Sequence, residues 1–225
     1  MRLAALTAWA LLGAGAAGAQ TMDRDNPTCP SRPNWSDTSE MRFTVQQRPG
    51  QSPVLLAEGA IDENLIPRLR EAMARFDGSE VWLRSIGGDA RVGNEAGRII
   101  RQRGLLTRIP SGWACRGACN FMFFGGIGRF IDDRGLFIVQ MFTLEGAGSD
   151  LGERARVAAF VATEDYEFVR QMGVSTRLLA DTMYRQSARG TRNDPSTYRC
   201  LTPAEIAEYN VALSRSANAP SRDSK

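Results

Sequence analysis

An apolar strand, a double-glycine turn and an amphipathic helix follow one another between residues 81 and 103. Residues 81–83 are Val-Trp-Leu, the turn contains Gly87 and Gly88, and apolar residues at helical spacing follow from Gly93. Paired glycines let the backbone turn sharply between a strand and a helix. Units of this kind that recur along a chain favour parallel strands joined by helical crossovers. The pattern therefore predicts an α/β fold.

The rest of the chain continues the alternation of strands and helices. The expected strands are 54–60, 105–109 and 136–142, and the expected helices are 64–76, 119–124, 151–172, 176–183 and 203–213. Thr202 and Glu205 form a capping-box sequence that opens the last helix, with Pro203 at its first position. The length suits one domain rather than two, and that domain is expected to span 54–213.

The first 19 residues predict a signal peptide. Arg2 precedes an apolar run at 3–17, and 17–19 has the small-x-small pattern that signal peptidase cleaves. A membrane anchor is the alternative, but a spanning helix needs about 20 apolar residues and this run is shorter. We expect a mature chain that begins near Gln20, is periplasmic or secreted, and has no stable membrane insertion after cleavage.

The segments that flank the expected domain are polar. Residues 20–53 are rich in Pro, Ser, Asn, Asp and Gln, which is typical of an extended arm, and Cys29 is its expected anchor. Residues 214–225 have a similar polar character and predict a disordered tail. Neither segment is expected to contribute a packed element.

Four cysteines accompany the export signal, so disulfides are favoured over metal ligands or reactive thiols. Cys29 and Cys200 lie near opposite ends of the chain, while Cys115 and Cys119 are within bridging reach across one helical turn. We expect the pairs 29 with 200 and 115 with 119. A zinc site of four cysteines is the alternative, although one C-x3-C and two distant single cysteines are poor zinc spacing.

Histidine is absent from the sequence, and the one lysine is the terminal Lys225. Histidine and lysine are the side chains most often used as general bases near neutral pH. The formal net charge is only +3 and its charges are dispersed, so no nucleic-acid partner is implied. No cofactor and no metal are predicted.

Several motifs resemble the ClpP/crotonase superfamily. Residues 85–90 resemble the S-P-G-G-x-x turn of ClpP-type proteins, whose exposed backbone N–H groups form an oxyanion hole. Residues 112–119 are similar to the C-x-S-A-C stretch of exported ClpP-like proteins. Further likenesses, in family order, are 124–129 to a G-x-x-R stretch, 136–140 to the strand before the catalytic histidine, 166–179 to the helical handle, and 199–209 to a C-terminal R-x-L-T-x-x-E-A-x-x-Y segment.

The resemblance covers 54–211 and implies a repeated β-β-α spiral with a helical handle region. Gly87 and Gly88 take the place of the oxyanion turn. The sequence differs from the family pattern at the positions that carry the catalytic chemistry. Gly117 stands where the family has its nucleophilic serine, Gln140 where it has histidine, and Ile86 where the turn has proline. Asp194 falls where the aspartate of the triad would be. The resemblance therefore implies the fold without the proteolytic activity.

Other chemistry remains open at this site. Ser85 or Ser111 would lack an imidazole or amine base. Cys115 and Cys119 could act as thiolates at a helix start, Gln140 could bind a ligand carbonyl or local backbone, and Asp194 could serve a turn. The crotonase branch uses backbone oxyanion donors with a carboxylate, for which Glu95, Asp132 and Asp133 are the candidates.

These observations favour a periplasmic ClpP-like pseudoenzyme that binds a peptide or protein partner. The family packs through its handle helices, so a homo-oligomer with contacts along 151–172 is expected. The alternative is a hydrolase or lyase that uses the backbone oxyanion hole and a carboxylate as acid and base.

Overall fold

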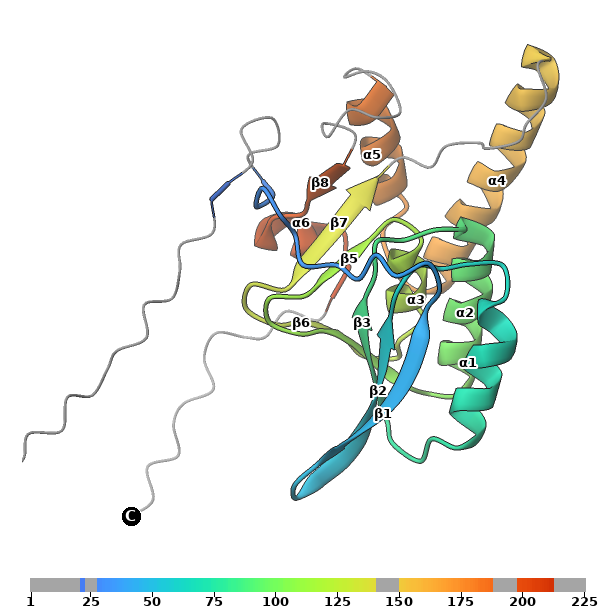
Figure 1. The fold of residues 1–225 in the computed structure, drawn as a ribbon. Helices are drawn as coiled ribbons and strands as arrows, with labels where there is room; N and C mark the ends of the chain where they lie inside the picture. The colour runs from blue at the N-terminus through green and yellow to red at the C-terminus, as the bar shows by residue number, and fades with distance from the viewer. Residues whose placement is uncertain (1–20, 23–27, 141–149, 188–197, 213–225) are drawn as a thin grey trace, which may run out of the picture.

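The structure is a computed structural model that describes residues 21–22, 28–140, 150–187 and 198–212. The predicted signal peptide, the predicted tail and Asp194 lie outside the described residues. Strands and helices are interspersed along the described chain, and several strands follow one another directly without a helix between them (Figure 1). The strands are β1 Arg42–Arg48, β2 Gln51–Glu58, β3 Glu80–Arg84, β4 Leu106–Ile109, β5 Ala114–Arg116, β6 Arg129–Ile131, β7 Leu136–Gln140 and β8 Tyr198–Cys200. The helices are α1 Leu65–Ala74, α2 Ala90–Gln102, α3 Cys119–Phe124, α4 Leu151–Gln171, α5 Arg177–Ser187 and α6 Pro203–Glu208.

The described strands form two sheets. The larger one has the order β1-β2-β3-β4-β6, in which β1 is antiparallel to β2 and the other neighbours are parallel. The smaller one has the order β5-β7-β8, with β5 parallel and β8 antiparallel to β7. A parallel bridge between Ser85 and Cys115 links the end of β3 to β5. The sequence predicts β2, β3, β4 and β7 among these parallel strands, whereas the short strands β5 and β6 are not among the predicted ones.

The predicted extended arm at 20–53 is wrong from Arg42 onward. β1 and β2 form an antiparallel hairpin at the edge of the larger sheet, and the predicted arm includes all of β1 and the start of β2 (Figure 1). Most side chains of β1 are exposed, on both faces of the strand, so few of them pack against the rest of the domain. Its polar composition therefore resembles that of an unpacked segment, and the domain begins about twelve residues earlier than the sequence suggests.

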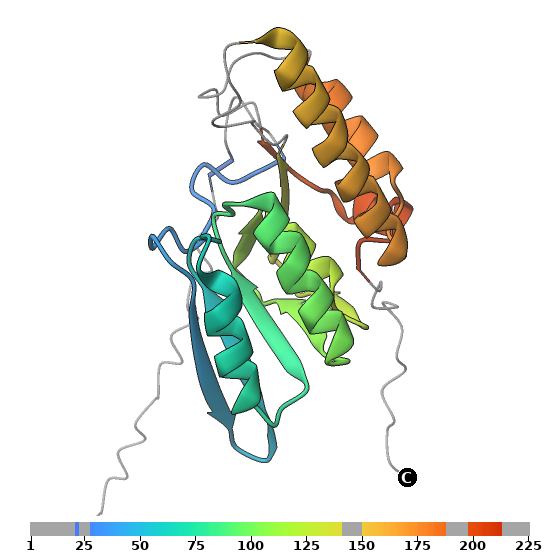
Figure 2. The ribbon, with the colours of Figure 1, turned by 90° about the vertical axis from the view of Figure 1, so that its right-hand side faces the viewer.

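Helices α1 and α2 cover one face of the larger sheet (Figures 1 and 2). Their buried apolar side chains are Leu65, Leu69, Met73, Ala96, Ile99 and Ile100. Asp89 caps α2, since its carboxylate accepts hydrogen bonds from the backbone N–H groups of Arg91 and Val92 at 2.8 and 3.1 Å. The helix therefore starts directly after the double-glycine turn, which places the turn at its N-terminal end.

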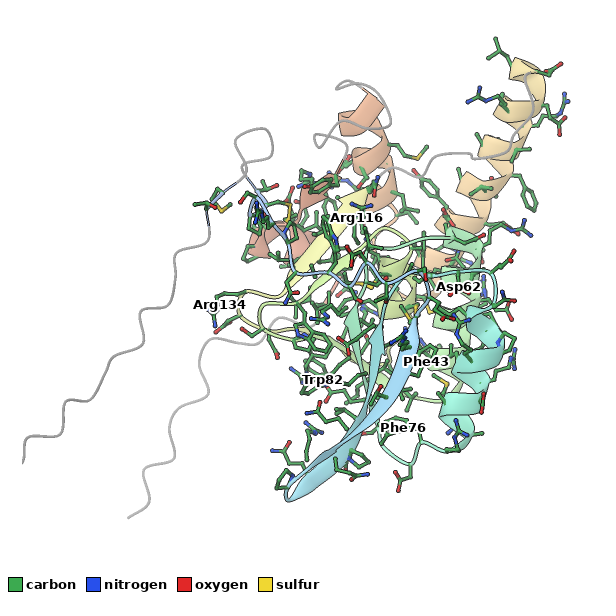
Figure 3. All side chains as sticks on the ribbon, in the orientation of Figure 1. Phe43, Asp62, Phe76, Trp82, Arg116 and Arg134 are labelled. Atoms are coloured by element: carbon green, nitrogen blue, oxygen red, sulfur yellow. A yellow bond between two sulfur atoms is a disulfide. The ribbon has the colours of Figure 1, made fainter. Side chains whose placement is uncertain are left out.

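Helix α4 packs against the domain only at its C-terminal end. Its buried residues are Asp165, Phe168 and Val169, while Leu151 and Phe160 are 80% and 59% exposed. Figures 1 and 2 show the N-terminal part of α4 reaching beyond the rest of the domain, and Figure 3 shows its side chains standing out from the ribbon. The helix therefore carries a long apolar and polar surface that its own domain does not cover.

Two features hold the C-terminal segment on the domain. Arg129 is buried and donates hydrogen bonds to the carbonyls of Val211, Met172 and Asn210 at 2.7, 2.9 and 2.9 Å. Burial lowers the pKa of this guanidinium to about 10, which leaves it charged at neutral pH. The second feature is the Cys29–Cys200 disulfide, which joins the segment before β1 to β8 and has the pairing that the sequence favours.

The last helix begins as predicted. Thr202 and Glu205 form the capping box, and Pro203 is the first residue of α6. The helix ends at Glu208 rather than near residue 213, because Asn210 has a positive φ of 54°. The chain turns at Asn210, and the carbonyls of Asn210 and Val211 accept the hydrogen bonds from Arg129.

Candidate functional site

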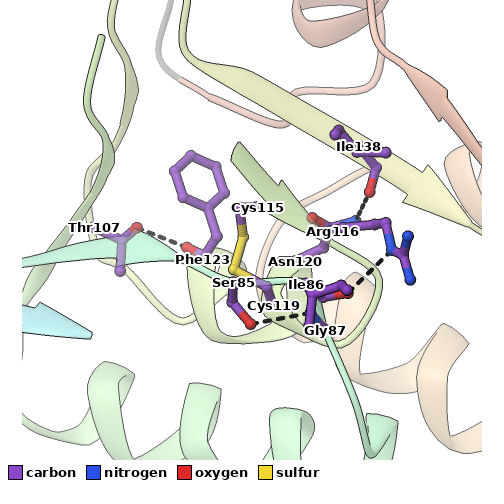
Figure 4. Close-up of a disulfide and its surroundings, with 10 residues drawn as sticks. All are labelled: Ser85, Ile86, Gly87, Thr107, Cys115, Arg116, Cys119, Asn120, Phe123 and Ile138. Atoms are coloured by element: carbon purple, nitrogen blue, oxygen red, sulfur yellow. Dashed lines mark hydrogen bonds between the residues drawn. A yellow bond between two sulfur atoms is a disulfide. The ribbon is translucent and has the colours of Figure 1, made fainter. Parts of the chain in front are cut away.

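Gly117 lies in a short loop between β5 and α3. The Cys115–Cys119 disulfide closes this loop (Figure 4). Its backbone N–H donates to the carbonyl of Ile138 at 3.2 Å, and its own carbonyl accepts from the N–H of Asn120 at 2.9 Å. The side-chain amide of Asn120 donates to the same Ile138 carbonyl at 2.9 Å. Crosslink and hydrogen bonds together fix the loop against β7. Both sulfurs are buried, which fits a structural disulfide rather than reactive thiols.

The fold brings Gly117 and Gln140 together. A Cβ atom added to Gly117 would lie 4.0 Å from Oε1 of Gln140, with no other described atom within that distance apart from its chain neighbours. Gly117 has a φ of 57°, in the left-handed region that favours glycine. A side chain at 117 would therefore point into open space towards Gln140. The two positions where the resemblance places a nucleophile and its base are neighbours in space.

The double-glycine turn packs against the other side of the same loop. A Cβ atom on Gly87 would lie 2.6 Å from the carbonyl oxygen of Arg116, and one on Gly88 would lie 2.1 Å from that of Ile61. Both glycines have positive φ, 97° and 145°, so no other residue fits without a shift of the backbone. The close contact places the turn beside residues 116–118.

The amides of the turn differ in what they bind. The N–H of Gly87 donates to Oγ of Ser85 at 3.0 Å (Figure 4). The N–H of Gly88 has no hydrogen-bond partner among the described residues. In this arrangement the backbone N–H of Gly88 is available to a ligand oxygen, whereas that of Gly87 is already bonded. An oxyanion-binding role for Gly87 and Gly88 stays a prediction. Ser85 is buried, and its hydroxyl oxygen accepts the hydrogen bond from Gly87. Ser111 lies in an exposed turn.

Arg116 is the charged residue next to Gly117 in the loop. Its Nε donates to the carbonyl of Ile86 at 3.0 Å (Figure 4). Its guanidinium lies over the rings of Trp35 and Tyr198, at 4.8 and 5.7 Å from their centroids. Burial lowers the pKa of this group. Arg116 thus links the turn, the N-terminal segment and β8.

The three carboxylates that the sequence suggests for acid–base chemistry are either exposed or paired with an arginine. Glu95 is exposed and pairs with Arg70 at 3.6 Å, Asp132 pairs with Arg108 at 2.5 Å, and Asp133 is exposed. None of the three lines the pocket beside Gln140, whose described lining residues come from β7, α4 and α5. The seven lining residues are Gln140, Ala162, Asp165, Tyr166, Leu179, Thr182 and Met183.

Asp165 is the carboxylate of this pocket, and sequence reasoning missed it. Its side chain is 1% exposed, and Oδ1 accepts from Nδ2 of Asn94 at 2.6 Å. Oδ2 has no hydrogen-bond partner among the described residues. Burial raises the pKa of Asp165 to about 6, and the charge of Glu164 adds to this, while the bond from Asn94 acts in the opposite direction. A signal was present, since Asp165 shares one helix face with Phe168, Val169 and Met172.

The described residues hold no group of three or more side chains that could bind a metal ion. In the same part of the chain, no helix combines the length and the hydrophobicity needed to cross a bilayer.

Comparison with solved structures identifies the fold. A mutant of ClpP1 from Listeria monocytogenes is similar with a TM-score of 0.50 and 13% identity, over 71% of this chain and 88% of that one. A peptidase from Plasmodium falciparum is similar with a TM-score of 0.50 and 9% identity, over 72% and 96% of the two chains. No protein-family model and no curated protein match the sequence. At such low identities the likeness establishes a ClpP-like fold and carries no statement about activity.

Proposed function

We propose that this chain, with its ClpP-like fold, is an exported pseudoenzyme that binds a peptide or protein partner without cleaving it. One observation carries the proposal. Gly117 and Gln140 are neighbours where a serine and a histidine would be needed, and the chain contains no histidine at all. These two neighbouring positions therefore offer neither a nucleophile nor a base.

The chemistry of the remaining residues supports the proposal. Glycine offers no nucleophile, and an amide such as Gln140 accepts no proton near neutral pH. Without the triad members, hydrolysis has only binding and oxyanion stabilisation, which give roughly 10³ to 10⁴-fold over water. This is too little for efficient turnover of peptides. The loop itself is well fixed, so the site is suited to holding a ligand in a defined position.

Export is part of the proposal. Two disulfides, both made of buried cysteines, suit an oxidising compartment such as the periplasm. The expected signal peptide at 1–19 points to the same location.

The pseudoenzyme proposal predicts how the chain responds to a serine-directed fluorophosphonate probe. The wild-type chain is expected to gain no probe mass, whereas the double variant Gly117→Ser with Gln140→His should be labelled. The added serine would face position 140, although its positive φ costs roughly 1–2 kcal/mol. Intact-mass spectrometry measures the labelling.

Each single variant serves as a control in this experiment. Gly117→Ser alone has a nucleophile without a base, and Gln140→His alone has a base without a nucleophile, so both should label far more slowly than the double variant. Labelling of the wild-type chain, or its cleavage of a casein digest, would contradict the pseudoenzyme proposal.

We also propose that the chain forms a homo-oligomer whose subunits contact one another through α4. The exposed Phe160 and Leu151 lie on the part of the helix that the domain leaves uncovered. Phe160→Glu is expected to raise the dissociation constant of the oligomer by about 10 to 100-fold, because it places a charge in an apolar contact. Sedimentation velocity over a dilution series measures this.

A matched control exists on another part of the surface. Ile127 is similarly exposed, at 55%, in the loop between α3 and β6, so Ile127→Glu introduces the same charge away from α4. It should leave the oligomer unchanged. A monomeric wild-type protein, or equal effects of the two variants, would show that α4 is not the contact.

A second candidate function, hydrolase or lyase chemistry, is favoured by one observation. Asp165 is a buried carboxylate with a pKa of about 6, close to the range that suits a general acid or base. Gly88 would then supply the amide for a substrate oxygen. Turnover of an activated ester by the wild-type chain, abolished in Asp165→Asn, would favour this candidate over the pseudoenzyme.

A further inference from the structure

The pocket beside Gln140 contains a buried carboxylate without a cationic partner. Asp165 is almost completely buried, and its Oδ2 has no hydrogen-bond partner among the described residues. Among the described lining residues none is basic. A buried charged oxygen without a partner is costly, so such a group is normally paired or bound to a ligand. The missing partner must be a hydrogen-bond donor, and a positively charged donor suits it best.

Three further polar side chains line the pocket, those of Gln140, Tyr166 and Thr182, and each has an oxygen that can accept a hydrogen bond. The amide of Gln140 and the hydroxyl of Tyr166 can also donate, but neither donates to Oδ2 of Asp165 in this structure. Thr182 donates its hydroxyl hydrogen to the carbonyl of Leu178 at 2.7 Å, which leaves its oxygen lone pairs for a further donor. The amide of Gln140 can accept through Oε1. The carboxylate of Glu164, next to Asp165 on α4, adds negative charge and raises the pKa of Asp165. The pocket therefore favours a cation that donates several hydrogen bonds.

The size of the pocket selects among cations. It has room for about one water molecule, which is close to the volume of an ammonium group. A guanidinium has four heavy atoms and is too large for this space. A metal ion such as Ca²⁺ requires six or more oxygen ligands, and Asp165 is the one carboxylate among the described lining residues. Ala162, Leu179 and Met183 are the apolar part of the lining, so the methylene group next to the ammonium would meet apolar side chains, while the rest of its alkyl stem would lie outside the pocket.

We propose that this pocket binds a primary ammonium group on an alkyl stem, with Oδ2 of Asp165 as its carboxylate partner. The proposal rests on the peptide-binding function proposed above and names what that site selects, namely a lysine side chain or a free N-terminus. Gln140 connects the two places, because it lines the pocket and its Oε1 lies 4.0 Å from the position of a Cβ atom added to Gly117. A peptide that lies along the loop can thus place one side chain in the pocket.

The test compares peptides that differ only in the ammonium group. The probes are acetyl-Ala-Ala-Lys-Ala-amide, the same peptide with norleucine for lysine, and the norleucine peptide with a free N-terminus. Titration calorimetry with the wild-type chain is expected to show at least about tenfold tighter binding of an ammonium peptide than of the acetylated norleucine peptide. The preferred ammonium peptide identifies the source, side chain or terminus. Equal binding of all three peptides overturns the proposal.

Variants test the role of Asp165. Asp165→Asn keeps the shape of the side chain, removes its charge and is expected to abolish the preference for ammonium. Glu164→Gln removes the exposed neighbouring charge and should keep most of the preference, which makes it the matched control. Circular dichroism checks the fold of both variants. If Asp165→Asn does not fold, the comparison of peptides on the wild-type chain decides.

A small probe separates this proposal from the function on which it rests. n-Butylammonium should shift the NMR signals of residues at the pocket, and 1-butanol should shift them far less. If n-butylammonium binds and needs Asp165 while no peptide binds, the ammonium site stands and the peptide-binding function fails. If neither n-butylammonium nor any peptide binds at millimolar concentration, the ammonium site is wrong. Mass spectrometry of the same peptide samples would reveal cleavage, which contradicts only the pseudoenzyme.

Discussion

Replacing Cys29 and Cys200 together by alanine is expected to lower the free energy of unfolding by about 5 kcal/mol. The two cysteines are 171 residues apart in sequence. A crosslink that closes so long a loop removes much of the conformational entropy of the unfolded chain, and the chain-entropy relation gives roughly 5 kcal/mol for this separation. Since native domains are stabilised by about 5–15 kcal/mol, the variant should be close to unfolding at 37 °C.

The second disulfide provides a matched control for this prediction. Cys115 and Cys119 are 4 residues apart, and the same relation gives only about 2 kcal/mol for the double alanine variant. Urea denaturation of oxidised wild type and of both variants, followed by circular dichroism, measures the three free energies. An equal loss in the two variants would show that packing of the buried sulfurs, rather than loop closure, determines the contribution.

Replacing Arg129 by methionine is expected to lower the free energy of unfolding by about 3–5 kcal/mol. Three backbone carbonyls, those of Met172, Asn210 and Val211, receive their hydrogen bonds from this one guanidinium. Methionine fills a similar volume without any donor, so the carbonyls lose their partner in a largely buried place. The end of α4 and the C-terminal segment should separate first, as increased hydrogen exchange there would show.

Lysine at position 129 distinguishes charge from geometry. Its single ammonium cannot donate to three carbonyls from the directions that the planar guanidinium reaches, so Arg129→Lys should recover only part of the loss. The surface variant Arg75→Ala breaks an exposed ion pair with Glu71 and should change the stability by less than about 1 kcal/mol. Full recovery in Arg129→Lys would indicate that the positive charge alone matters.

The regular elements could be predicted because their patterns are local. The strand, glycine turn and helix between 81 and 103 appear in the structure as β3, the Gly87–Gly88 turn and α2, with apolar residues buried on the expected face. The capping box at Thr202 is likewise a short-range pattern. Strand β1 could not be recognised in the same way, because its mostly exposed residues lack the alternation of buried and exposed positions on which the prediction depends.

The site could be predicted only in part. The places of Gly117 and Gln140 follow from the resemblance, and the fold makes them neighbours. The hydrogen bond from Gly87 to Ser85 depends on a rotamer that no pattern indicates. The importance of Asp165 depends on residues of β7 and α5 that approach it from distant parts of the chain. A polar residue on an apolar helix face can be noticed in the sequence, but its enclosure arises only from packing.

The Cys29–Cys200 bridge also imposes an order on the maturation of the chain. Synthesis starts at the N-terminus, so Cys29 is available long before Cys200, and Cys115 and Cys119 appear between them. The first partners that Cys29 can meet are therefore the wrong ones. We expect maturation in an oxidising compartment to depend on early closure of the 115–119 loop or on thiol–disulfide exchange, with the terminal bridge formed last. Completion of that bridge then marks a chain that has been made at least as far as Cys200 and has docked β8 beside the segment that contains Cys29.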